Sequence, residues 1–160
     1  MTMIVVDASP LIMLARSELL AVLIAVAGRI IAPKAVFEEC VASLEKPGGK
    51  AILTAQAAGL IDVRPAAWTG ELLPALGSGE LAAIALAKDL GCPLLMDERL
   101  GRRIASLHGV SFIGSAAILI KAKERGLVQD VKPILEEWSA HGYFLSKALT
   151  DAVLARVGER

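Results

Sequence analysis

Aromatic residues and long apolar runs are scarce in this sequence. Only 4% of its 160 residues are Phe, Trp or Tyr while 55% are hydrophobic, so the core must consist of Ala, Leu, Ile and Val. The longest unbroken apolar stretch runs from Leu19 to Ala27. It is far shorter than the ~20 residues that a membrane-spanning helix needs. No basic residue precedes the first apolar segment, which argues against a signal peptide. We expect a cytoplasmic protein that does not enter a membrane.

Cysteines are few, and neither sign of charge is in excess. Cys40 and Cys92 are the only cysteines, and they have neither metal-ligand nor disulfide-framework spacing. Lys and Arg together number 17, as do Asp and Glu. The chain therefore lacks the overall basic charge of a non-specific nucleic-acid binder. Any nucleic acid must be bound through a local patch.

Short apolar strands alternate with helices along the chain. Strands are predicted at residues 3–6, 30–32, 61–63, 93–96 and 110–113. Helices are predicted to start at Pro10, to span 18–27, and to run from Pro33 to about Ser43. A further helix follows the break at 46–49 and ends at Gly59, and others are predicted over 79–90, 101–107 and 115–125, with two more C-terminal to these. Residues 64–77 are expected to form a loop.

This alternation favours parallel strands joined by right-handed crossovers, with helices on both faces of the sheet. The expected fold class is α/β, a three-layer α/β/α sandwich with a central parallel sheet. We expect one domain over 1–160, with its core at about 3–128 and C-terminal helices within 130–158.

Two predicted strands end in an aspartate. Asp7 follows the apolar residues IVV, and Asp97 follows PLLM. Because ligands bind beyond the carboxyl ends of strands in open parallel sheets, these two acids are candidates for a site. The alternative is that each Asp starts a turn or caps the next helix.

Two further acids fall in the first turns of predicted helices. Glu80 follows Gly77-Ser78-Gly79, where the helix dipole alone favours an acid. Glu38 and Glu39 follow a strand, and Glu39 is the better placed to point towards the sheet edge. A solvated surface is the alternative for this pair, and which of the two is the ligand stays open.

Several carboxylates at one sheet edge, without a base among them, require compensation. Two unit charges ~4 Å apart repel by about 4 kcal/mol at an effective dielectric constant near 20. Oxygen ligands without His or Cys favour Mg²⁺ or Mn²⁺ over zinc. Ions held in this way suit the hydrolysis of phosphodiester bonds. We therefore expect a bound metal to compensate Asp7.

The motifs resemble those of PIN-domain proteins, and in particular a VapC-like subfamily of toxin ribonucleases. The matching segments are DASPLI at 7–12, Pro33-x-x-Val36-x-x-Glu39, Gly79-Glu80, LLMD at 94–97, GRRIA at 101–105 and GSAAILIKAKERGLV at 114–128. The resemblance extends over about residues 3–145. The resemblance implies a Rossmann-like fold and a metal-dependent acidic site that cuts RNA.

The resemblance also assigns residues and partners. It makes Asp7, Glu39, Glu80 and Asp97 the metal-holding acids, and Ser9 a hydroxyl that hydrogen-bonds within their cluster. A helix N-cap ahead of Pro10 is an equally good use of Ser9. The family further implies a homodimer and a small antitoxin partner. The chain departs from the toxin pattern in having Glu80 where many relatives have Asp, and Asp97-Glu98-Arg99 without a following aromatic.

A local basic patch is available close to Asp97. Arg99, Arg102 and Arg103 are spaced to form one helix face that can bind RNA phosphates, or else a solvated face with an ion pair. His108 and His141 lie near helix ends without a partner at ligand spacing, so neither is assigned to catalysis. Trp68 and Trp138 are interpreted as core or interface anchors.

The leading hypothesis is a metal-dependent endoribonuclease that acts as a toxin. The alternative is a PIN-like module that keeps the acids but cuts nothing, and acts by binding RNA or protein. A dinucleotide-binding enzyme is disfavoured because DASPLI, not a glycine-rich loop, follows the first strand. A phosphotransfer receiver domain is disfavoured because it needs paired acids at the first strand and a late lysine.

Overall fold

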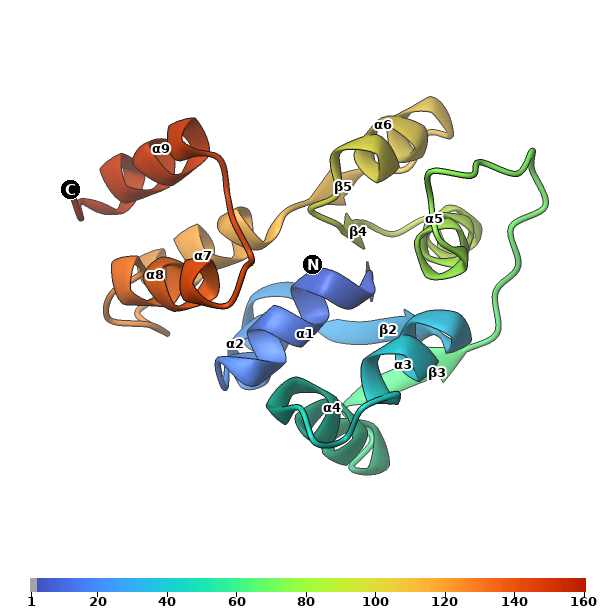
Figure 1. The fold of residues 1–160 in the computed structure, drawn as a ribbon, viewed down its shortest axis with the longest axis horizontal. Coiled ribbons are helices and arrows are strands. Elements are labelled where there is room, and N and C mark those ends of the chain that lie inside the picture. Colours follow the sequence, from blue (N-terminus) through green and yellow to red (C-terminus); the bar gives the residue numbers. More distant parts are fainter. Residues whose placement is uncertain (1–2) are drawn as a thin grey trace. The chain divides into compact units, whose positions relative to one another are not determined.

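A computed structural model describes residues 3–160 of the chain (Figure 1). The chain divides into two compact units, one ending at Ser115 and the other formed by Ala116–Arg160. Within the described residues, no helix combines the length and the apolar composition needed to cross a bilayer.

The first unit contains a five-stranded parallel sheet with the strand order β3-β2-β1-β4-β5. The strands are β1 (Met3–Val6), β2 (Arg29–Pro33), β3 (Ile61–Arg64), β4 (Leu94–Leu95) and β5 (Phe112–Ile113). β1 lies at the centre, with Val5 opposite both Ile31 of β2 and Leu94 of β4. The ends of β1 and β4 therefore meet at one edge of the sheet, which confirms the predicted α/β fold with a central parallel sheet.

Six helices of the first unit flank the sheet in Figure 1: α1 (Ala8–Arg16), α2 (Leu20–Ala27), α3 (Lys34–Val41), α4 (Pro47–Ala57), α5 (Ser78–Leu90) and α6 (Arg99–Leu107). Ile4, Val5 and Val6 of β1 are completely buried, as are Ile30 and Ile31 of β2. Such continuous apolar strands are typical of a parallel sheet covered on both faces. The core therefore lies around the central strands, and the polar residues that follow them lie at its edge.

The second unit is helical. It contains α7 (Ser115–Glu124, of which Ser115 belongs to the first unit), α8 (Lys132–Ala140) and α9 (Lys147–Val157). Trp138 is completely buried and packs edge-on against Tyr143, with ring centroids 5.7 Å apart. The prediction of one domain over 1–160 stays a prediction.

Several predicted element boundaries were wrong, each for a local reason. Pro33 ends β2 and is the N-cap of α3, because its extended backbone (ψ 148°) still belongs to the strand. α1 begins at Ala8, directly after Asp7, and not at Pro10. α6 begins at Arg99 because the Glu98 carboxylate accepts hydrogen bonds from the amides of Leu100 and Gly101.

Candidate active site

Asp7 lies at the end of β1, where it is only 4% exposed. Its backbone N–H donates to the carbonyl oxygen of Leu95 at 3.0 Å, which ties the end of β1 to the end of β4. Asp7 is the N-cap residue of α1, but its side chain makes no capping hydrogen bond. The capping alternative therefore does not account for this buried carboxylate.

The other three predicted acids act electrostatically on Asp7. Burial is the largest cause that raises the pKa of Asp7 from 3.8 to about 7, and the negative charges of Glu80, Glu39 and Asp97 raise it further. A backbone hydrogen bond from Ala8 opposes the shift. Acids that lie up to 90 positions away in the sequence are thus close enough to Asp7 for their charges to disfavour its ionisation.

Glu80 lies in the first turn of α5 with its two carboxylate oxygens in different settings. Oε1 accepts a hydrogen bond from the Gly77 amide at 3.3 Å. Oε2 is buried and has no hydrogen-bond partner among the described residues. Burial raises the pKa of Glu80, and the charges of Glu98 and Glu39 add to the shift. A buried oxygen without a partner costs free energy, so Oε2 is the oxygen that a cation would satisfy.

Glu39 lies beside the start of α5, whereas its neighbour Glu38 does not. A methyl group added at Gly79 would lie 3.2 Å from Glu39 Oε1, which shows how closely the two helices approach here. Both glutamates are exposed, and Glu38 pairs with Lys34 at 4.0 Å on the same helix. Burial, followed by the charges of Glu39 and Asp7, raises the pKa of the Cys40 thiol to about 12. Of the two glutamates, Glu39 is the one whose charge reaches Asp7.

Asp97 follows β4 and is held by Ser115 at the start of α7. The Ser115 amide donates to Asp97 Oδ1 at 2.8 Å, and the Ser115 hydroxyl donates to Oδ2 at 2.6 Å. Arg102 Nη2 lies 3.6 Å from Oδ1. Sequence reasoning missed the role of Ser115. The available signal was a serine two residues after the last strand, at the same sheet edge as the acids.

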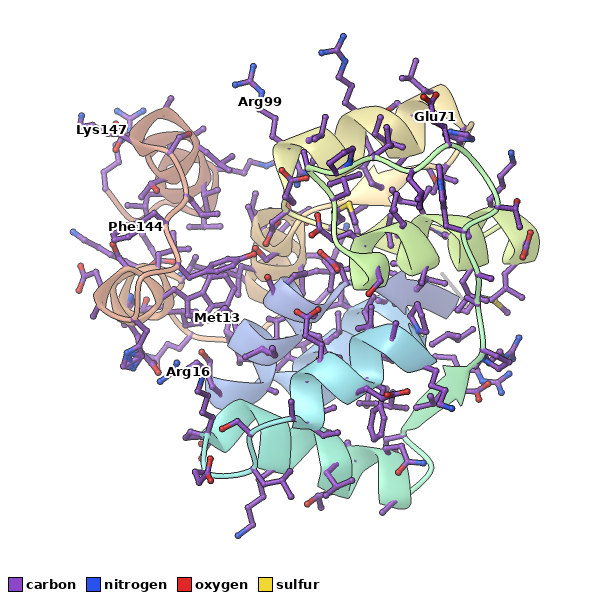
Figure 2. The ribbon with its side chains drawn as sticks, turned by 45° about the vertical axis from the view of Figure 1, so that its right-hand side comes forward. Met13, Arg16, Glu71, Arg99, Phe144 and Lys147 are labelled. Atoms are coloured by element: carbon purple, nitrogen blue, oxygen red, sulfur yellow. The ribbon has the colours of Figure 1, made fainter. Side chains whose placement is uncertain are left out.

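The remaining predicted residues lie on two helices. Ser9 is exposed in the first turn of α1, and its expected hydrogen bond within the acidic cluster stays a prediction. Arg102 turns inward, since its Nε donates to the Met96 carbonyl oxygen at 2.8 Å. Arg99 and Arg103 are exposed, and Figure 2 shows Arg99 extending away from α6. These two are therefore the arginines of the predicted patch that a phosphate can reach.

The acids fit a divalent cation in chemistry but do not yet surround one. Within residues 3–160, no group of three or more Asp, Glu, His or Cys side chains is already arranged to hold a metal ion. The donor set is nevertheless made of carboxylate oxygens, which Mg²⁺ and Mn²⁺ prefer. The partnerless Oε2 of Glu80 and the repulsion around Asp7 would both be relieved by a cation.

Two apolar hollows lie elsewhere. One of about 540 Å³ in the first unit is lined by Trp68, Leu72 and other apolar residues. Another of about 220 Å³, within the second unit, is lined by residues that include Leu135, Tyr143 and Leu154. Neither is lined by any of the predicted site residues, so neither competes with the acidic edge as the place of catalysis.

Comparisons with known proteins agree with the fold and identify the family. Among solved structures, a PilT N-terminus domain protein from the hyperthermophilic archaeon Sulfolobus solfataricus P2 aligns with a TM-score of 0.53 and 14% identity, over 73% of this chain and 90% of that one. A domain of a functionally unknown protein from Methanocaldococcus jannaschii DSM 2661 aligns with a TM-score of 0.44 and 19% identity, over 71% and 91%. The search of curated proteins found no match. The family model described as "DUF3368: PIN domain" matches residues 3–159. The chain belongs to the PIN-domain family.

Proposed function

We propose that the protein is a divalent-metal-dependent ribonuclease that hydrolyses RNA phosphodiester bonds. The observation that carries the proposal is the buried Asp7 carboxyl, whose pKa burial and the charges of Glu80, Glu39 and Asp97 raise to about 7. Strongly perturbed carboxyls at the carboxyl edge of a parallel sheet are typical of functional sites. PIN domains are generally nucleases, which favours this chemistry over other uses of an acidic edge.

Asp7, Glu39, Glu80 and Asp97 are the residues that would hold Mg²⁺ or Mn²⁺. When bound, such an ion lowers the pKa of a coordinated water and stabilises charge on the phosphate oxygens. The raised pKa of Asp7 means that its proton must leave as the cation binds. Hydrolysis breaks the bond between phosphorus and the 3′ oxygen, and leaves a 5′ phosphate and a 3′ hydroxyl.

Arg99 and Arg103 are the residues that we expect to contact the RNA backbone. Both are exposed on α6, the helix that begins two residues after Asp97. Guanidinium groups match phosphate oxygens in geometry as well as charge. Arg102 is engaged with the Met96 carbonyl and Asp97, so its contribution would be to hold Asp97 in place and not to bind RNA directly.

We also propose that the protein is the toxin of a type II toxin–antitoxin pair, that it forms a homodimer and that a small antitoxin binds it. The segments that resemble VapC-like proteins support this part of the proposal: GRRIA at 101–105 and GSAAILIKAKERGLV at 114–128. The target RNA would then be a specific cellular species, and binding by the antitoxin would block its cleavage.

The test compares RNA cleavage by the wild-type protein, Asp7→Asn and Asp97→Asn in Mn²⁺ and in EDTA. We expect the wild type to cut RNA only when the metal is present. Each variant should lose at least about 100-fold in rate, because removing a residue that merely contacts a metal ligand already costs up to about 100-fold. Glu39→Gln and Glu38→Gln form a matched pair on one helix. The first is expected to lose activity and the second to keep it. Equal cleavage by all variants would contradict the proposal.

One observation favours a second candidate, a PIN-like module that binds without cutting. The acids are not yet arranged as a metal-ligand set within residues 3–160. Such a module would bind RNA or a protein partner equally well in EDTA and in Mn²⁺. Tight binding independent of metal, with no turnover in the cleavage assay, would favour this candidate over the nuclease.

A further inference from the structure

Ser115 commits both of its hydrogen-bond donors to one carboxylate. The side chain is completely buried. Its amide donates to Asp97 Oδ1 at 2.8 Å and its hydroxyl to Asp97 Oδ2 at 2.6 Å, so each carboxylate oxygen receives one bond. Two bonds from a single residue to both oxygens fix the plane of the carboxylate as well as its position.

The residue before Ser115 leaves room for this arrangement. A Cβ atom added at Gly114 would overlap the guanidinium of Arg102 and would lie 2.9 Å from Asp97 Oδ1. Since real Cβ atoms do not approach other atoms this closely, any larger residue at position 114 would displace Asp97 or Arg102. The turn between β5 and α7 therefore needs glycine at position 114 for Asp97 and Arg102 to keep these positions.

Arg102 holds the same carboxylate from a third element. Its Nε donates to the Met96 carbonyl oxygen at 2.8 Å, and its Nη2 lies 3.6 Å from Asp97 Oδ1. The guanidinium also stacks over the Phe112 ring, 4.9 Å from its centroid. Asp97 is thus restrained by α6 and by the start of α7. Asp7 differs, because its side chain makes no capping hydrogen bond in its own helix.

We propose that Ser115 is a positioning residue that holds the Asp97 carboxylate in the orientation needed for the divalent metal and RNA hydrolysis. The inference rests on the proposed function and adds to it a residue outside the four acids. The hydroxyl restrains Oδ2 while the amide restrains Oδ1, so the carboxylate meets an incoming cation without first losing rotational freedom. Such outer contacts typically change metal affinity or activity by about 10–100-fold when they are removed.

The test removes the hydroxyl and keeps the amide. Ser115→Ala is expected to weaken Mn²⁺ binding, measured by calorimetry without RNA, by about 10–100-fold. It is also expected to lower kcat for RNA cleavage while KM for RNA stays unchanged. Ser115→Thr keeps the hydroxyl and should restore most of both values. Ser115→Cys keeps the size of the side chain, but its thiol is only a weak hydrogen-bond donor. Its Mn²⁺ affinity and kcat should therefore lie between those of Ser115→Ala and wild type, even if Ser115→Ala destabilises the fold.

Ser146→Ala is the matched control for simple loss of stability. The Ser146 hydroxyl accepts a hydrogen bond from the Leu149 amide at 3.1 Å and caps α9, away from the four acids in the sequence. This variant should lower the melting temperature but leave Mn²⁺ affinity and kcat unchanged. If Ser115→Ala and Ser115→Cys behave in the same way as Ser146→Ala, Ser115 merely stabilises the fold and the inference is overturned.

The two proposals fail separately in this experiment. A wild-type protein that binds Mn²⁺ but does not cut RNA would contradict the nuclease, while the calorimetric comparison of the Ser115 variants would still decide the role of Ser115. A wild-type protein that neither binds Mn²⁺ nor cuts RNA would overturn both. Wild-type cleavage with an unchanged Ser115→Ala would overturn the inference alone.

Discussion

At the residue scale, the buried carboxyl of Asp7 is not an ordinary surface charge. Asp7 has a pKa of about 7, raised first by burial and then by Glu80, Glu39 and Asp97. The folded protein therefore holds a proton that the unfolded chain releases near its ordinary pKa of 3.8. In the metal-free protein, the contribution of Asp7 to stability is present below that value and is lost as the pH rises towards 7.

Asp7→Asn is expected to stabilise the metal-free protein at pH 8 because the amide has the same shape and no charge. The gain should disappear near pH 4, where the folded Asp7 is protonated. Each ~1 kcal/mol of stabilisation raises the melting temperature by about 2–4 °C for a chain of this size. Thermal melts in EDTA at the two pH values measure the effect. If Asp7→Asn leaves the melting temperature at pH 8 unchanged, ionisation of the buried Asp7 does not destabilise the folded protein.

At the element scale, two glutamates cap helix N-termini, and the sequence patterns did not predict either cap. Glu98 caps α6, and Glu159 caps α8 from beyond the end of α9. The Glu159 carboxylate accepts hydrogen bonds from the amides of Val131 and Lys132 at 2.8 and 2.9 Å and pairs with Lys123 at 3.0 Å. Its burial alone would raise its pKa, but these partners lower the pKa below the usual value of 4.5.

Glu159→Gln is expected to destabilise the protein by about 1 kcal/mol at neutral pH, the typical cost of losing a helix cap. Because the folded pKa is lowered, this stabilisation is present above 4.5 and is lost as the pH falls through the folded value. The difference between Glu159→Gln and wild type should therefore shrink in acid. Denaturant unfolding at pH 7 and pH 3 measures it, with exposed Glu137→Gln on α8 as the control. A difference that does not depend on pH would contradict the assignment.

Sequence patterns predicted the strand order along the chain and the acids at strand ends, because a buried parallel strand is almost entirely apolar and an acid after it stands out. They did not predict that Ser115 and Arg102 hold Asp97. Those contacts depend on β4 pairing with β5 in a register that places Leu95 opposite Ile113, so that the Met96 amide donates to the Ile113 carbonyl oxygen. The sequence patterns also overestimated the lengths of β4 and β5. Apolar residues such as Pro93 and Val110 flank these two-residue strands without belonging to them.

At the scale of the whole molecule, the proposed metal site would link metal binding to folding. A cation that binds only the folded protein stabilises it by mass action, by about 2.7 kcal/mol at 100 times its dissociation constant. Mn²⁺ is therefore expected to raise the melting temperature of the wild type but not that of Asp7→Asn or Glu80→Gln. Differential scanning fluorimetry across a Mn²⁺ titration measures this. An equal rise in all three proteins would indicate that the ion binds elsewhere.

The assembly proposed here is also testable at this scale. We expect the purified chain to elute as a homodimer, with a mass by light scattering of twice its 16.8 kDa. Co-expression with an antitoxin encoded by a neighbouring gene, as the proposal requires, should give a stable complex in which RNA cleavage is inhibited. A monomer at all concentrations, with cleavage unaffected by that neighbour, would contradict the toxin–antitoxin proposal while leaving the nuclease intact.

The most direct test of the metal site is anomalous diffraction from crystals grown with Mn²⁺. We predict a manganese peak coordinated by carboxylate oxygens of Asp7 and Glu80, with Asp97 held by Ser115 on the same side of the ion. A fully occupied manganese peak bound elsewhere, or none at this edge at saturating Mn²⁺, would contradict the metal-dependent nuclease.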